Sequence, residues 1–133
     1  MNLSRFRFAA LVVAVLLVTA CAPAPVRNVM DAPVVSNKDS VTLDNVRDAV
    51  TRAGAGLGWI MIEEGPGRVR GTLRLRDHVA IVDVTFDTST YNIKYVDSTN
   101  LNYNKTSGTI HKNYNGWIQN LDTAIQRELA ALM

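Results

Sequence analysis

The chain has 133 residues, with 14 Lys and Arg against 12 Asp and Glu, two His and a single Cys. One cysteine excludes an internal disulfide, and a net charge of +2 is too small to attract nucleic acid by a field of the whole molecule. We therefore predict no nucleic-acid partner. We also predict no metal or cofactor, because the two histidines show no spacing typical of metal ligands.

Residues 1–20 are predicted to be a signal peptide. Arg5 and Arg7 precede an apolar run over 8–18 that is too short for a membrane-spanning helix. The run ends in Val-Thr-Ala-Cys, which resembles the lipobox of bacterial lipoproteins. This resemblance implies lipidation at Cys21, and Ala22 in the next position implies sorting to the outer membrane. Without the two arginines, 12 basic residues balance the 12 acidic ones.

Residues 21–40 follow as a predicted flexible tether behind the lipidated cysteine. The segment contains Pro23, Pro25 and Pro33 and shows neither helical nor strand periodicity. The remaining residues, 41–133, are predicted to form a single α+β domain in the periplasm.

A first helix is predicted to begin after Thr42, a residue suited to the N-cap. Gly54 and Gly56 are expected to end this helix. Its apolar face is narrow and consists of small residues at helical spacing: Val46, Ala49, Val50 and Ala53.

A strand is predicted over 59–62, and a Gly-Pro-Gly turn leads into the next strand. Two registers are open. Pairing Glu63 with Arg68 buries the two isoleucines of the strand, whereas a slip of one residue buries Trp59 and Met61. We favour the first register because it gives Glu63 an ion-pair partner.

The segment 68–87 shows two runs of period-two alternation joined at Asp77 and His78, which we predict to be a two-residue hairpin loop. Arg76 then pairs with Val79. One face is apolar, with the pairs Leu75–Ala80, Leu73–Val82, Gly71–Val84 and Val69–Phe86. The other face is polar, with the pairs Arg74–Ile81, Thr72–Asp83, Arg70–Thr85 and Arg68–Asp87.

A fourth strand is predicted to return after the turn 87–90. Pairing Phe86 with Tyr91 aligns Asp83 with Lys94 on the polar face. The same register aligns two apolar pairs, Val84–Ile93 and Val82–Tyr95. The segment 97–112 is rich in Asn, Ser, Thr and Gly and is predicted to be mainly a loop.

The last helix is predicted over 113–132. Its apolar residues recur near every 3.6 positions: Tyr114, Trp117, Ile118, Leu121, Ile125, Leu129 and Leu132. The sequence thus predicts an α+β fold, an antiparallel meander of about four strands with an N-terminal helix and a long C-terminal helix packed on one sheet face. In this arrangement, Trp117→Ala would cost about 3 to 5 kcal/mol.

Four short segments carry a resemblance to a family of small proteobacterial lipoproteins without an assigned activity. These segments are Gly58-Trp59, Arg76 to Ala80, Tyr91 to Tyr95 with Asp97-Ser98 and Asn100-Leu101, and Ile110-His111 with Tyr114 to Ile118 and Asn120-Leu121. The similarity covers residues from about 42 to 130. It implies an envelope location and one domain, and it implies no catalytic residue.

Four arginines form a candidate anion-binding row on the polar face: Arg68, Arg70, Arg74 and Arg76. Guanidinium groups in such a row can bind phosphates or carboxylates. The alternative, which we favour, is a solvated face with cross-strand ion pairs to acidic residues.

A second candidate is a groove near the predicted loop, made of polar and aromatic side chains: Asp97, Ser98, Asn100, Tyr103, His111, Tyr114 and Asn115. Such residues either line a binding groove or hold a long loop by hydrogen bonds to its own backbone. We favour the second interpretation.

The predicted function is a non-enzymatic lipoprotein, anchored in the outer membrane by its N-terminal lipid and facing the periplasm. Its domain would bind another envelope component, such as a protein, peptidoglycan or lipopolysaccharide. The alternative is a small enzyme acting on the cell wall, which would require several ionisable side chains to converge in a cleft.

Overall fold

The computed structural model describes residues 23–133, so the predicted signal peptide and Cys21 lie outside the described residues. Its main sheet has five antiparallel strands in the order β2-β6-β5-β4-β3. Four of them form the predicted meander, β3 (Ile60–Gly65), β4 (Arg68–Leu75), β5 (His78–Phe86) and β6 (Thr90–Thr99), and β2 (Val29–Pro33) adds a fifth strand beside β6. The α+β class is confirmed, with one strand more than expected.

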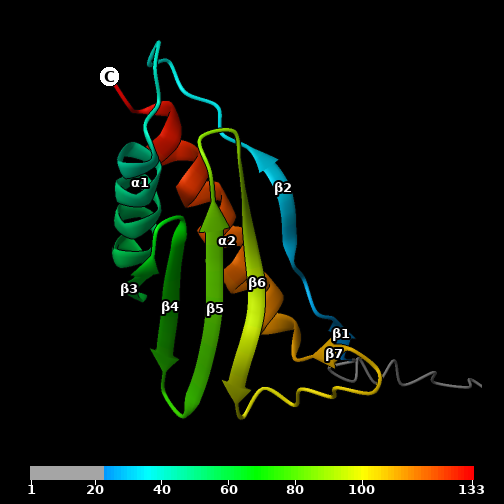
Figure 1. Cartoon of the computed structure of the whole chain (residues 1–133). Coiled ribbons are helices and arrows are strands. Elements are labelled where there is room, and N and C mark those ends of the chain that lie inside the picture. The colour runs from blue at the N-terminus through cyan, green and yellow to red at the C-terminus, as the bar shows by residue number, and fades with distance from the viewer. Residues whose placement is uncertain (1–22) are drawn as a thin grey trace, which may run out of the picture.

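Two helices accompany the sheet, α1 (Leu43–Gly56) and α2 (Lys112–Ala130); in Figure 1 α2 passes behind the strands and α1 lies to their left. Helix α1 begins where the sequence predicts. The hydroxyl of Thr42 accepts from the backbone N–H of Asn45, whose side chain accepts from the N–H of Thr42, so the first turn has a capping box. Among residues 23–133 no helix is both long enough and apolar enough to span a membrane.

One hydrophobic cluster joins both helices to the sheet. Its members without solvent exposure include Val46 and Val50 of α1, Val82, Val84 and Ile93 of the sheet, and Ile118, Leu121 and Ile125 of α2. Each fully buried aliphatic side chain of this size contributes about 1.5 to 3 kcal/mol, so this cluster provides most of the driving force for folding.

The β4–β5 turn lies one residue earlier than predicted, at Arg76 and Asp77, and Leu75 therefore pairs with His78. The partner of each residue shifts by two positions, which leaves every side chain on its predicted face. For this reason the apolar pattern does not determine the register. The observed register brings Asp83 opposite Arg70. The predicted pairs Thr72–Asp83 and Arg68–Asp87 are thus wrong.

The favoured register for β3 is also wrong, and the slipped alternative describes the burial correctly. Trp59 is only 4% exposed, whereas Ile60 and Ile62 are 56% and 58% exposed. Burying the large indole removes more apolar surface from water than burying an isoleucine. Trp117 is only partly buried, so the large loss of stability predicted for Trp117→Ala is expected for Trp59→Ala instead. On the other side of the meander, the predicted β5–β6 pairs are confirmed.

The N-terminal segment predicted to be a flexible tether is part of the fold over most of its described length. A short strand, β1 (Ala24–Pro25), pairs with β7 (Thr109–Ile110), and β2 pairs with β6. Strand β2 was not recognised because it is short, ends in Pro33 and contains a register shift between Val29 and Ala32. These features are typical of an edge strand.

Candidate functional site

Arg68 and Arg70, the first half of the arginine row, both bind the carboxylate of Asp83. Arg70 donates to both carboxylate oxygens of Asp83, at 2.9 and 3.1 Å, and Arg68 donates to one of them at 2.7 Å. The side chain of Asp83 is only 14% exposed. The hydrogen bond from Arg70 is the main reason that the pKa of Asp83 is below its usual value. These two arginines therefore connect β4 to β5 through Asp83.

The second half of the row lies at the other end of β4. Arg74 and Arg76 are exposed, and neither has an ion-pair partner among the residues that the structure describes. Arg76 occupies the turn with a φ of 57°. The four arginines therefore divide into a paired half and an unpaired half, and they do not form one anion site.

Two of the predicted groove residues hold the chain around the start of α2. The ring nitrogen Nδ1 of His111 accepts from the N–H of Asn113 and caps the helix. The side chain of Asn115 donates to the carbonyl of Pro25 at 2.8 Å and accepts from the N–H of Arg27 at 2.8 Å. These contacts fasten the N-terminal segment to α2.

Asn100 connects the end of β6 to the β4–β5 turn. Its side chain donates to the carbonyl of Asp77 at 2.9 Å, and its own carbonyl lies 2.8 Å from Nδ1 of His78. The N–H of Ser98 donates to the carboxylate of Asp97 at 2.8 Å. These residues also bond to backbone groups, although Asn100 bonds to the β4–β5 turn and not to the backbone of its own loop.

Three tyrosines cluster behind this loop. The rings of Tyr95 and Tyr103 lie 4.3 Å apart, and those of Tyr95 and Tyr114 meet edge to face at 5.6 Å. The hydroxyl of Tyr114 is buried and has no hydrogen-bond partner among the described residues. Burial raises the pKa of this phenol, which stays neutral. Tyr103 remains 40% exposed beside the loop.

The sequence analysis does not predict a buried polar contact between β6 and α2. The hydroxyl of Tyr91 donates to Asp122 at 2.5 Å, and Gln126 donates to the same carboxylate at 3.2 Å. Asp122 is 8% exposed. Its position beside Leu121 and Ile125 on the apolar face of the last helix is the signal that could have revealed a buried carboxylate.

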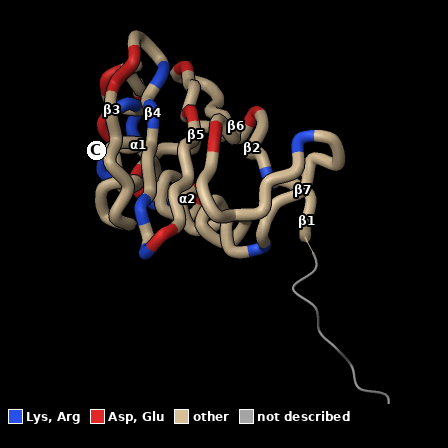
Figure 2. Tube along the Cα trace, turned by 90° about the horizontal axis from the view of Figure 1, so that it is seen from below, with Lys and Arg blue, Asp and Glu red and all other residues tan. Residues whose placement is uncertain are grey.

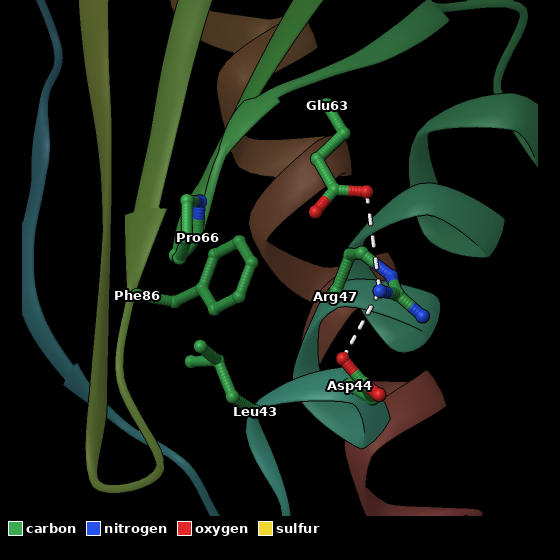
Figure 3. Close-up of a pocket in the computed structure, with 7 residues that line it drawn as sticks. Leu43, Asp44, Arg47, Glu63, Pro66 and Phe86 are labelled. Atoms are coloured by element: carbon green, nitrogen blue, oxygen red, sulfur yellow. Dashed lines mark hydrogen bonds and ion pairs between the residues drawn. The ribbon is translucent and has the colours of Figure 1, made fainter.

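The hollows on the described surface are lined mainly by residues other than the predicted site residues. One hollow of about 370 Å³ is lined by Pro33, Val35, Gln126 and Ala130. A smaller one of about 130 Å³ lies between the start of α1 and the β3–β4 turn, where Arg47 bridges Asp44 at 3.0 Å and Glu63 at 3.9 Å (Figure 3). Of the predicted groove residues, only His111 lines the hollow of about 220 Å³ beside β7.

The two edges of the sheet differ in chemistry. The β2 edge contains Pro33 and a register shift, and Asp31 has a φ of 52°. Such features discourage pairing with another chain. The β3 edge has no proline and carries Ile60 and Ile62 with more than half of their surface exposed. This exposed edge is the feature of the described surface most suited to binding an extended segment.

No family model, curated protein or solved structure matches this chain. Within residues 23–133, no three His, Cys, Asp or Glu side chains are grouped so that they could hold a metal ion.

Proposed function

We propose that this protein is a non-enzymatic lipoprotein of the outer membrane, facing the periplasm, that binds another envelope protein through the edge of β3. Lipid attachment at Cys21 rests on the lipobox-like sequence. The observation that carries the binding function is the pair of exposed isoleucines on an edge strand.

The proposed binding mode is strand addition. An extended segment would pair with the free backbone groups of β3 and place apolar side chains over Ile60 and Ile62, which lie on the same sheet face. In this proposal both helices cover the opposite face, as the shared core cluster and Figure 1 support. Glu63 and Glu64 at the end of the strand would favour a basic residue in the partner.

Lipid attachment is tested by Cys21→Ala in the full-length chain. The variant should lose its lipid and its partitioning into the membrane fraction. Retention in the membrane after cleavage of the signal peptide would contradict the lipoprotein assignment. Its mass and its detergent partitioning are the measurements.

Binding through β3 is tested with a photo-crosslinking amino acid at position 62 in living cells, and with one at position 30 of β2 as the control. Met30 is 54% exposed, which is close to the exposure of Ile62. We expect a protein adduct at position 62 that Ile60→Lys abolishes, because a charge on this edge opposes pairing. Equal adducts at both positions, or none at position 62, would contradict the proposal.

A further inference from the structure

The structure limits how far the fold can lie from the proposed lipid. Strand β1 begins at Ala24, and its pairing with β7 is extended by a hydrogen bond of 2.9 Å from the N–H of Val26 to the carbonyl of Gly108. Three residues of chain span at most about 11 Å, whatever their conformation. Lipidation at Cys21 would therefore hold the β1–β7 end of the domain directly at the membrane surface.

We call this end of the molecule the anchoring end. It comprises β1, β7, the loop 100–108, the start of α2 and the tip of the β4–β5 turn, which lie together in the lower part of Figure 1. The segments 23–30 and 98–121 contain no Asp or Glu, although they contain Arg27, Lys105 and Lys112. Figure 2 views this end directly and shows basic positions on the loop before β7.

The region of the β4–β5 tip adds two basic and two acidic residues to the anchoring end, so the excess positive charge of this end comes from Arg27, Lys105 and Lys112. Arg74 and Arg76 lie there without ion-pair partners among the described residues, and the acidic residues nearby are Asp77 and Asp97. Many of the other carboxylates lie toward the opposite end, at the β3–β4 turn, the β5–β6 turn and the start of α1: Glu63, Glu64, Asp87, Asp44 and Asp48. Acidic and basic residues nearly balance over the chain, but the fold places an excess of basic residues at the anchoring end.

Tyr103 gives the anchoring end a second feature suited to a membrane. Its ring is 40% exposed and is held against Tyr95 at 4.3 Å, on the same loop as Lys105. Exposed tyrosines beside basic residues are typical of proteins at the level of lipid head groups, where the ring contacts acyl chains and the hydroxyl stays in water.

We infer that the anchoring end binds the head groups of anionic phospholipids and so orients the domain with its acidic end away from the membrane. The inference rests on the proposed lipid at Cys21 for the placement of this end, and it adds a contact that the lipid alone does not supply. One acyl anchor with a basic surface binds a membrane more firmly than either does alone.

The first test does not depend on lipidation. The chain from residue 22, which contains every described strand and helix, is sedimented with vesicles of phosphatidylcholine alone or mixed with phosphatidylglycerol. We expect binding only to the anionic vesicles, weakened by salt. The variant Arg27→Gln, Lys105→Gln, Lys112→Gln should lose roughly tenfold or more in affinity.

The matched control removes the same charge elsewhere, with Lys38→Gln, Arg52→Gln and Arg127→Gln. This variant should keep most of the affinity, because these residues lie outside the anchoring end: Lys38 in the segment before α1, Arg52 on α1 and Arg127 in the last turn of α2. Equal loss in both triple variants, or equal binding to neutral vesicles, would overturn the inference.

The second test measures orientation in the lipidated full-length protein. Lipidation consumes the only native thiol, so one introduced cysteine carries a unique fluorophore. A label at Thr106→Cys should be quenched strongly by a quencher attached to lipid head groups, and a label at Thr88→Cys in the β5–β6 turn weakly. Equal quenching would overturn the inference. Failure of lipid attachment with a positive first test would instead contradict only the proposed function.

Discussion

At the scale of single residues, the polar face of the sheet is organised around one carboxylate. Asp83 accepts from Arg68 and Arg70 and is largely covered, so cross-strand ion pairs of the kind that the sequence suggests do form, with Asp83 instead of Asp87 as the partner of Arg68. Arg70 is the leading cause of the lowered pKa of Asp83. A group whose pKa is lower in the folded state stabilises the fold above its unfolded value, near 3.9, and loses that contribution as the pH falls.

Asp83→Asn should therefore lower the free energy of unfolding at pH 7 by about 1 to 2 kcal/mol, because two partly exposed guanidinium groups lose their shared acceptor. Below about pH 4 the wild type loses the same contribution, and the two proteins should converge. Urea unfolding at both pH values measures this difference. Asp39→Asn is the control, since Asp39 is exposed. A constant difference between the two proteins at all pH values would contradict the assignment.

At the scale of elements, the contact between α1 and β3 depends on a glycine inside the helix. The sequence predicts that Gly54 and Gly56 end α1, and the helix does end at Gly56, which leaves Gly54 inside it. A Cβ added to Gly54 would lie 2.7 Å from Cγ of Met61 on β3. The missing side chain therefore lets the helix approach the strand closely.

Gly54→Ala should destabilise the protein by up to about 2 kcal/mol, because the cost of displacing the Met61 side chain exceeds the gain of about 1 kcal/mol from the better helix propensity of alanine. Gly56→Ala is the matched control, since no atom lies within 4 Å of its added Cβ, and it should be neutral or stabilising by up to about 1 kcal/mol. Thermal unfolding of both variants and of Gly54→Ala with Met61→Ala measures this. Equal stability of the two single variants would refute the close approach.

Periodicity predicts the helices and strands of residues 41–133 better than it predicts their pairing. The caps and apolar stripes of α1 and α2 are local signals and are found within about two residues of their predicted bounds. The β4–β5 register is ambiguous because a shift of two residues preserves both faces. The β3 register was assigned by one ion pair of Glu63, whose worth is small beside the burial of Trp59.

At the scale of the whole molecule, the predicted domain begins at residue 41, whereas the fold already includes β1 and β2. Some candidate groove residues do bond to backbone groups, but the partners of Asn115 are Pro25 and Arg27 in the segment predicted to be a tether. No local pattern reveals such contacts, because they join residues about 90 positions apart. The consequence is a fold that begins within three residues of Cys21 along the chain.

This folded beginning gives a prediction with an internal control. Val29 is 9% exposed and belongs to the core, whereas its neighbour Met30 is 54% exposed. Val29→Asp should lower the free energy of unfolding by about 3 kcal/mol or more, since it places an unpaired carboxylate against apolar side chains. Met30→Asp should change it by less than about 0.5 kcal/mol. Urea unfolding of the chain from residue 22 provides the comparison. If residues 21–40 were a flexible tether, both substitutions would be tolerated equally, because neither side chain would be packed against the core.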